Sequence, residues 1–265
     1  MSTTIERAYV TGASSGIGRE LCLRLVERGC EVVAIARREE RLRELAEACR
    51  GRTGTLHVET LDVADTDAAR ASVFAWDDRL GGAEGRGLDL VVANAGVGLG
   101  EHAARLPWTD VRRTFEVNVL GATAVLVAGL ERMAPRERGT LVGISSLAGT
   151  GGMPSSGAYS ASKAALSVFL ETLAIDLRGS AVRVVDVQPG YVVSEMTADA
   201  EHPLPFLWPT DRAVRRILRG IERGAPRVRF PLGVALPLAL LDAAPRPVWR
   251  AVMALAGRAS RRDRG

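Results

Sequence analysis

Short apolar runs alternate with amphipathic stretches along most of the chain. The runs that have the length and β-branched content of buried strands are 5–10, 31–36, 55–61, 88–93, 140–144 and 182–187. Between them, apolar residues recur at three- and four-residue spacing, which predicts helices that include 39–49, 67–80 and 158–177. This alternation predicts an α/β fold with a doubly wound parallel sheet that helices cover on both faces.

The first predicted strand leads directly into a glycine-rich turn. Residues 11–18 read Thr-Gly-Ala-Ser-Ser-Gly-Ile-Gly, and a helical period begins immediately after them. Glycines allow a close approach of the backbone to a ligand, and the amides at the start of a helix suit a pyrophosphate. Three glycines also occur in ordinary turns, so the position between the first strand and the first helix is what favours a dinucleotide site.

Lys163 is the only lysine among the 35 Lys and Arg residues, and it follows Tyr159 by four positions. Residues four apart on a helix share a face, so the two side chains are expected to converge. A cation beside a phenol favours the phenolate, and we therefore expect Lys163 to lower the pKa of Tyr159. This makes Tyr159 a candidate general acid/base. The alternative is a surface lysine on an arginine-rich helix.

Several further segments, taken with these two, resemble the short-chain dehydrogenase/reductase family. The order and spacing match over about residues 5–195, in Thr11-Gly-x-x-x-Gly-x-Gly18, Asn94-Ala95-Gly96, Asn118, Ser145-Ser146, Tyr159-x-x-x-Lys163 and Pro189-Gly190. The resemblance implies a Rossmann-type sheet of about seven strands. It also implies an oxidoreductase that interconverts a carbonyl and a secondary alcohol by direct hydride transfer with a nicotinamide cofactor.

The resemblance implies catalytic roles for four residues. Tyr159 would exchange a proton with the substrate oxygen, and Ser146 would hydrogen-bond the same oxygen; its spacing from Tyr159 favours it over Ser145. Lys163 would also hold the nicotinamide ribose, and Asn118 would position a water in a proton relay. Seen alone, Ser146 fits a cap equally well, and Asn118 fits a buried amide that satisfies backbone groups within its helix.

The end of the second strand bears on the choice of cofactor. An acidic residue there would bind the adenosine ribose, but the chain has Ala36 followed by Arg37 and Arg38. A guanidinium suits a phosphate, so we predict NADP(H) over NAD(H), with Arg37 as the main phosphate contact and Arg38 solvated. The other cofactor contacts that the resemblance implies, besides Tyr159 and Lys163, are Gly12, Ser14, Ser15, Gly16, Ile17, Gly18, Asp62, Val63, Asn94, Ala95, Gly96, Pro189, Gly190, Val192 and Ser194.

Bulky apolar residues follow Pro189-Gly190. We expect 191–212 to cover a lipophilic ketone, aldehyde or alcohol, lined by Tyr191, Met196, Pro203, Leu204, Pro205, Phe206, Leu207 and Trp208, with His202 in reach. Arg212, Arg215 and Arg216 would suit a phosphorylated substrate or a carrier-bound one, as in a 3-oxoacyl reductase, although a solvated face is the more ordinary interpretation. We expect one domain, with 1–225 forming its dinucleotide-binding and catalytic part and 226–265 adding a strand and an apolar helical extension.

The apolar segment 230–256 leaves three interpretations open. It would cap the substrate pocket, form an interface in a homodimer or homotetramer, or rest on a membrane surface beside the basic tail. The run 230–241 contains Pro231 and Pro237 and is too short to span a bilayer. Packing against the protein itself or a partner subunit is favoured.

The remaining composition bounds the context. The net charge is +4, but the arginines are interleaved with acids, so no nucleic-acid partner is expected. Cys22, Cys30 and Cys49 have no metal-ligand spacing, and no metal site is predicted. The cysteines and the lack of a basic-then-apolar leader lead us to expect a cytoplasmic protein. A non-catalytic NADP(H)-binding regulator is the alternative to an enzyme, and the complete catalytic set favours the enzyme.

Overall fold

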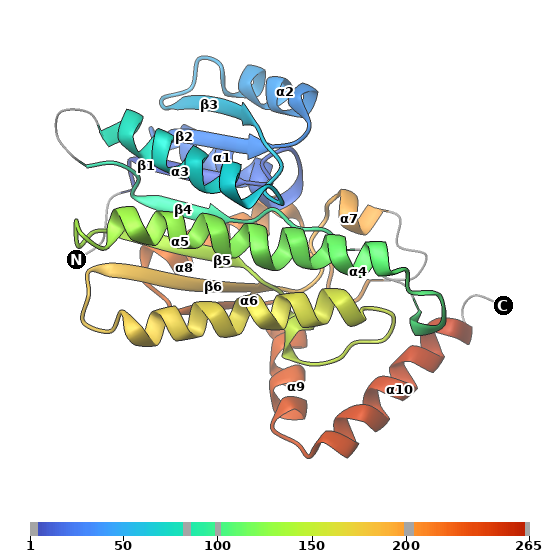
Figure 1. The fold of residues 1–265 in the computed structure, drawn as a ribbon. Helices are drawn as coiled ribbons and strands as arrows, with labels where there is room; N and C mark the ends of the chain where they lie inside the picture. The colour runs from blue at the N-terminus through green and yellow to red at the C-terminus, as the bar shows by residue number, and fades with distance from the viewer. Residues whose placement is uncertain (1–4, 82–85, 99–101, 199–203, 263–265) are drawn as a thin grey trace.

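The computed structural model describes residues 5–81, 86–98, 102–198 and 204–262. A single seven-stranded parallel sheet has the order β3-β2-β1-β4-β5-β6-β7 (Figure 1). Its strands are β1 (Arg7–Thr11), β2 (Glu31–Ala36), β3 (Thr55–Thr60), β4 (Leu90–Ala93), β5 (Gly139–Ile144), β6 (Val182–Pro189) and β7 (Arg227–Phe230). The predicted doubly wound sheet is confirmed. The strand order reverses between β1 and β4, which is where sheets of this kind bind ligands, at the carboxyl ends of the strands.

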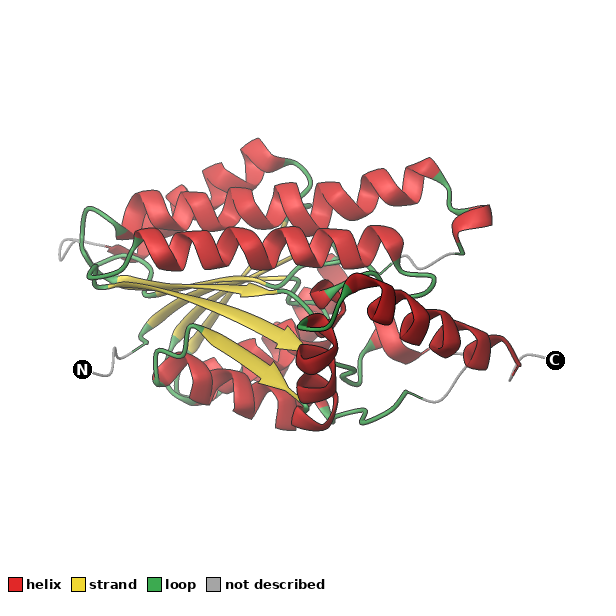
Figure 2. Cartoon of the chain, turned by 90° about the horizontal axis from the view of Figure 1, so that it is seen from below, coloured by secondary structure: helices red, strands yellow, loops and turns green. Residues whose placement is uncertain are grey.

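Helices cover both faces of the sheet (Figure 2). One face carries α1 (Gly16–Glu27), α2 (Glu39–Cys49) and α8 (Thr210–Glu222), and the other carries α3 (Thr66–Gly81), α5 (Ala122–Met133) and α6 (Gly157–Asp176). Val184 and Val185 on β6 belong to different apolar cores, because successive strand side chains point to opposite faces. The α6 face of β6 therefore carries residues 182, 184, 186 and 188.

A long helical stretch, Trp108–Met133, crosses one face of the sheet. It consists of α4 (Trp108–Phe115), the π-helical η3 (Glu116–Gly121) and α5. Its length and composition would allow a membrane crossing, but half of its most apolar window is buried inside the domain, as in a core helix. Asn118 lies in the π-helical part, and such wide turns frequently occur at functional sites.

The C-terminal segment forms two helices after β7. Helices α9 (Leu232–Asp242) and α10 (Arg246–Arg262) project from the domain beside the carboxyl ends of the strands (Figure 1). The indole of Trp249 is buried and donates a hydrogen bond to the Gly152 carbonyl at 3.1 Å. This contact attaches α10 to the loop that follows the short helix η4 (Leu147–Thr150).

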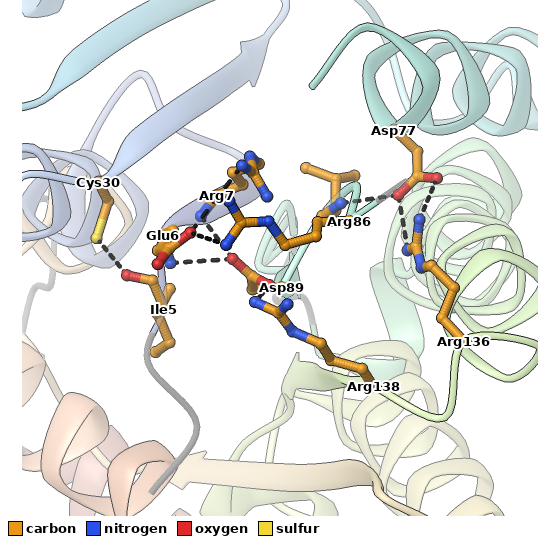
Figure 3. Close-up of polar contacts among 10 residues, drawn as sticks. Ile5, Glu6, Arg7, Cys30, Asp77, Arg86, Asp89, Arg136 and Arg138 are labelled. Atoms are coloured by element: carbon orange, nitrogen blue, oxygen red, sulfur yellow. Dashed lines mark hydrogen bonds and ion pairs between the residues drawn. The ribbon is translucent and has the colours of Figure 1, made fainter. Parts of the chain in front are cut away.

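A polar network closes the opposite, amino-terminal edge of the sheet (Figure 3). Asp89 is fully buried and accepts hydrogen bonds from the Glu6 and Arg7 amides, both at 3.0 Å, and from Arg138 at 2.5 Å. Asp77 on α3 binds Arg136 through two hydrogen bonds of 2.8 and 2.9 Å and accepts the Leu88 amide at 2.8 Å. The two carboxylates thus tie the starts of β1 and β4 to the segment between α5 and β5.

Candidate active site

The glycine turn, residues 11–18, connects β1 to α1. Gly12 and Gly16 have positive φ values of +68° and +52°, which favour glycine. A Cβ at Gly12 would lie 2.7 Å from the Cα of Ala95, and one at Gly18 would lie 2.4 Å from the Gly12 oxygen. The side chain of Ser15, the N-cap of α1, makes no capping hydrogen bond. The first amides of this twelve-residue helix therefore face the cavity without a side-chain cap and fit a pyrophosphate.

The ends of β1 and β4 are locked together by Thr11 and Asn94. The buried Thr11 hydroxyl accepts hydrogen bonds from the Asn94 and Ala95 amides at 3.0 and 3.1 Å. The Asn94 side chain donates to the carbonyls of Thr11 at 2.9 Å and Gly12 at 3.2 Å. The Asn94 side chain therefore holds the glycine turn by its carbonyl groups. Thr11 positions the ends of both strands, although it was not among the predicted contacts.

Ser146, Tyr159 and Lys163 lie together where β5 ends. Tyr159 and Lys163 occupy the first turns of α6, and a hydrogen bond joins Tyr159 to Ser146. Lys163 is buried, donates a hydrogen bond to the Ile144 carbonyl at 2.8 Å, and lies 5.8 Å from the centroid of the Tyr159 ring. The convergence expected from the four-residue spacing is present.

The pKa of Tyr159 differs from the sequence-based expectation. Burial raises this pKa above its ordinary value, the hydrogen bond to Ser146 opposes the rise, and the charge of Tyr191 adds to it. The expected lowering by Lys163 was wrong, because the ammonium is directed to a backbone carbonyl while the phenol is desolvated. Tyr159 is consequently protonated at neutral pH, as a proton donor must be.

Asn118 is fully buried and holds the loop after β4. Its side-chain oxygen accepts the Val97 amide at 2.8 Å, and its nitrogen donates to the Val97 carbonyl at 2.9 Å and to Ser162 at 3.0 Å. The interpretation as a buried amide fits, although the satisfied backbone lies outside its helix. Ser162 was missed: it donates to the Tyr159 carbonyl at 2.7 Å, and its only sequence signal was its place between Tyr159 and Lys163.

The two adjacent serines have different environments. The Ser145 hydroxyl contacts the carboxylate of Asp186 and the Val187 carbonyl, within the sheet. The Ser146 hydroxyl accepts the Ala148 amide at 3.0 Å, as the cap of η4, and lies beside Tyr159. Ser146 is therefore a cap, as one of the two interpretations expected, and its place beside Tyr159 is compatible with the predicted contact to the substrate oxygen.

The arginines after β2 differ from the expectation in one respect. Arg38 is not simply solvated: it hydrogen-bonds the Ser14 hydroxyl at 3.0 Å and pairs with Glu195 of α7 (Glu195–Ala198) at 2.7 Å. Arg37 lies 3.9 Å from Asp62, whose carboxylate also accepts from Arg113 at 2.6 Å. The ion pairs of Arg38 with Glu195 and of Asp62 with Arg113 could not be predicted, because the partners lie in distant segments.

One cavity of about 1690 Å³ joins these groups. Gly18 and Asn118 are not part of the lining formed by the described residues; they lie behind it and act through the glycine turn and the loop of Val97. The predicted site residues that line the cavity are Gly12, Ser14, Ser15, Gly16, Ile17, Arg37, Asp62, Val63, Asn94, Ala95, Gly96, Ser146, Tyr159, Lys163, Pro189, Gly190, Val192 and Ser194.

The far end of the cavity is apolar. Its walls come from the covering segment, from α9 and from α10, and include Tyr191, Met196, Leu204, Pro205, Val234, Leu238, Met253 and Ala256. The prediction was wrong for three described residues that are not part of the lining. Phe206 and Leu207 are 60% and 42% exposed, and Trp208 stacks on Phe230 with ring centroids 5.1 Å apart. His202, Pro203 and the side chains of the basic tail lie outside the described residues.

Sequence comparison agrees with this geometry. Residues 6–204, most of the chain, match the family described as short chain dehydrogenase. The chain belongs to the short-chain dehydrogenase/reductase family. Membership makes it an oxidoreductase that acts on alcohol or carbonyl groups with a nicotinamide cofactor, in agreement with the glycine turn and the Tyr159–Lys163 pair.

Three similar members of the short-chain dehydrogenase/reductase family illustrate its range. An uncharacterized oxidoreductase of Myxococcus xanthus is 48% identical, over 92% of this chain and 94% of its own. The NADP-dependent 3-hydroxy acid dehydrogenase of Escherichia coli K12 is 34% identical over 69% of this chain and 71% of its own. The crystal structure of a bulky-bulky ketone specific alcohol dehydrogenase from Comamonas testosteroni matches with a TM-score of 0.78 at 25% identity, over 94% and 95%.

Proposed function

We propose that this protein is an NADP(H)-dependent reductase that interconverts a carbonyl and a secondary alcohol on a lipophilic substrate. The observation that carries the proposal is the single cavity with two chemically different ends. One end has the glycine turn and the arginines after β2, and the other has apolar walls. Tyr159 and Ser146 also line it.

The choice of NADP(H) rests on the end of β2. Ala36 leaves no carboxylate there to repel a 2′-phosphate, and Arg37 and Arg38 both extend from this point toward the cavity. Arg38 already contacts Ser14 of the glycine turn, so two groups suited to a phosphate lie side by side. The similar enzyme of Escherichia coli is NADP-dependent, which supports the same choice.

Proton transfer is assigned to Tyr159. A bound nicotinamide dinucleotide supplies the hydride, and Tyr159 supplies the proton to the carbonyl oxygen during reduction. Ser146 would donate a hydrogen bond to that oxygen, and its long contact of 3.4 Å with the Pro189 carbonyl supports this role. The buried Lys163 ammonium stabilises the negative charge that Tyr159 gains. Onward transfer through a water near Asn118 stays a prediction.

The lipophilic substrate is inferred from the cavity wall. Met153, Leu204, Leu238 and Met253 contribute apolar surface around the space in front of Tyr159. The similar alcohol dehydrogenase from Comamonas testosteroni is specific for bulky-bulky ketones, a substrate class that this wall would also suit.

The carrier-bound 3-oxoacyl substrate and the non-catalytic binding protein gain less support. Arg212 packs over the Trp208 ring at 4.0 Å, and Arg215 pairs with Asp211 at 2.6 Å. Among the described residues, the cavity lining does not include Arg212, Arg215 or Arg216. A carrier-bound 3-oxoacyl substrate therefore has no evident basic docking point at the cavity. A non-catalytic binding protein would not need Ser146, Tyr159 and Lys163 gathered at one point.

We also propose a homodimer or homotetramer in the cytoplasm. Val168 and Ile175 on α6 and Leu236 and Leu240 on α9 are exposed apolar side chains that suit a subunit interface. A membrane contact through α9 is less favoured, because Val234 and Leu238 of the same helix line the cavity.

The proposal is tested by titration with NADPH and, separately, NADH, followed by absorbance of the reduced nicotinamide across a panel of bulky ketones and aldehydes. We expect tighter binding of NADPH and its oxidation with at least one apolar ketone. Tyr159→Phe is the control for background oxidation. Equal affinity for both cofactors would contradict the NADP(H) assignment, and tight binding without turnover across the panel would favour the binding protein.

A further inference from the structure

A strip of polar side chains follows α6, from the buried Lys163 to Glu171, whose side chain is exposed. Lys163, Ser167 and Glu171 are spaced four residues apart on α6 and therefore share a face. Lys163 contacts the Ile144 carbonyl of β5, Ser167 accepts a hydrogen bond from Gln188 of β6 at 3.1 Å, and Glu171 pairs with Arg227 of β7 at 3.4 Å. The strip thus crosses three neighbouring strands.

Asp186 is the buried carboxylate of this strip. It is 2% exposed and accepts hydrogen bonds from Ser145 and from Gln188, the latter at 2.6 Å. The Arg227 guanidinium lies 3.5 Å away and is opposite Asp186 in the register of β6 and β7. Every group that contacts the carboxylate is a donor, which is the environment of an ionised aspartate.

The register of the sheet places Asp186 on the side of Lys163. Asp186 pairs with Gly143 of β5, and a Cβ at Gly143 would lie 2.4 Å from Leu170 of α6. Paired residues on neighbouring strands point to the same face, so the Asp186 side chain also points toward α6. Lys163 reaches the sheet next to it, at the Ile144 carbonyl.

Lys163 needs an opposite charge at this position. Burial lowers the pKa of Lys163 to about 8, and the charge of Asp186 acts in the opposite direction. The other charged groups of the packed elements are Arg227, which contacts both Asp186 and Glu171, Arg229, which binds Gln188, and Glu116 of η3, which pairs with Arg112. The Tyr159 ring also lies near the lysine, with its centroid 5.8 Å from the ammonium.

We infer that Asp186 is the counter-ion that keeps Lys163 charged inside the active site, and that it acts as a positioning residue for proton transfer by Tyr159. Asp186 does not touch the cavity; it acts through the ammonium and through Ser145, which joins the carboxylate to the end of β5. The counter-ion part concerns Lys163 alone, whereas the positioning part rests on the proposed function.

The sole lysine of the chain makes a direct test simple. Lysine labelled with carbon-13 at the ε position gives one side-chain NMR signal when the purification tag contains no lysine. We expect a titration midpoint of about 8 for the wild type. Asp186→Asn keeps the size of the side chain but removes its charge, so the midpoint should fall by about one pH unit, the size of shift that a nearby opposite charge produces.

A second variant moves the signal in the other direction. Arg227 competes for the carboxylate and is about one-third exposed, so Arg227→Gln is a mild change. It frees the charge of Asp186 to act on Lys163, and the midpoint should rise. Asp89→Asn is the matched control: it neutralises a buried aspartate at the opposite edge of the sheet and should leave the midpoint unchanged. The counter-ion assignment would be overturned if the midpoint of Lys163 moved in neither Asp186→Asn nor Arg227→Gln. If Asp186→Asn fails to fold, the midpoint in Arg227→Gln alone tests the assignment.

The positioning part is tested by the pH profile of ketone reduction. The alkaline loss of turnover should follow the NMR midpoint, moving to lower pH in Asp186→Asn and to higher pH in Arg227→Gln. A profile that stays fixed while the midpoint moves would defeat the positioning part. Absence of turnover in the wild type would defeat the proposed function and leave the NMR result intact.

Discussion

Buried charged groups have different numbers of partners at the two edges of the sheet. At the amino-terminal edge, Asp77 and Asp89 each meet a guanidinium and at least one backbone amide (Figure 3). At the carboxyl edge, the buried Lys163 ammonium has three donors and, among the described residues, one hydrogen-bond acceptor. Carboxylates that are paired with a guanidinium stabilise one arrangement, whereas an under-coordinated ammonium with a shifted pKa can act on a ligand. We therefore expect substitutions at the amino-terminal edge to affect mainly stability, and substitutions at the carboxyl edge to affect mainly turnover.

The largest expected effect is the loss of the proton donor at the carboxyl edge. Tyr159→Phe should lower turnover by about 10²- to 10⁴-fold, the usual contribution of general acid catalysis, with NADPH affinity retained. Ketone-dependent oxidation of NADPH and a fluorescence titration of the cofactor measure the two quantities. Turnover within a few-fold of the wild type would show that another group supplies the proton.

The corresponding change at the amino edge should affect stability instead. Asp89→Asn leaves the partly exposed Arg138 without its carboxylate and weakens the hydrogen bonds to the Glu6 and Arg7 amides, so it should cost about 1–3 kcal/mol of unfolding free energy. Urea unfolding measures the loss, and turnover per folded molecule should match the wild type. A specific loss of turnover at unchanged stability would break the separation between the edges.

The stability of the protein should depend on pH through Lys163 at the carboxyl edge. The pKa of Lys163 is about 8 when folded and 10.5 in its ordinary state, so the unfolded chain binds more protons between these values. Stability therefore rises with pH across this window, by at most about 1.4 kcal/mol per pH unit. The rise should be absent from Lys163→Met, measured as the difference in urea unfolding between the two proteins from pH 7 to 10. Parallel curves for both would show that Lys163 titrates normally.

The smallest expected effect concerns the exposed arginines after β2. Arg38→Ala removes a group that contacts Ser14 and should weaken NADPH binding about tenfold while changing NADH binding little. Arg37→Ala should act in the same direction. Arg43→Ala, on the same helix but paired with Glu39, is the matched control. Equal losses for NADPH and NADH would remove the phosphate-contact argument.

The fold and the central site were predictable because their signals are local. Alternating apolar runs predicted the parallel sheet, the position of the glycines between the first strand and the first helix favoured a dinucleotide turn, and a four-residue spacing brought Tyr159 to Lys163. The pKa of Tyr159 was not predictable, because its burial depends on packing between distant segments. The same reason applies to the tie between Asn118 and Val97 and to the ion pair of Arg38 with Glu195.

The apolar wall that α9 and α10 contribute comes from residues beyond 204, where the match to the family ends. Under the proposed function, a large part of the wall around the substrate is thus separable along the sequence from the residues proposed for hydride and proton transfer. Selection can alter Leu238 or Met253 without disturbing Tyr159 or the glycine turn. A chimaera that takes its last segment from a related enzyme should therefore inherit that relative's substrate range and keep this protein's cofactor and catalytic apparatus.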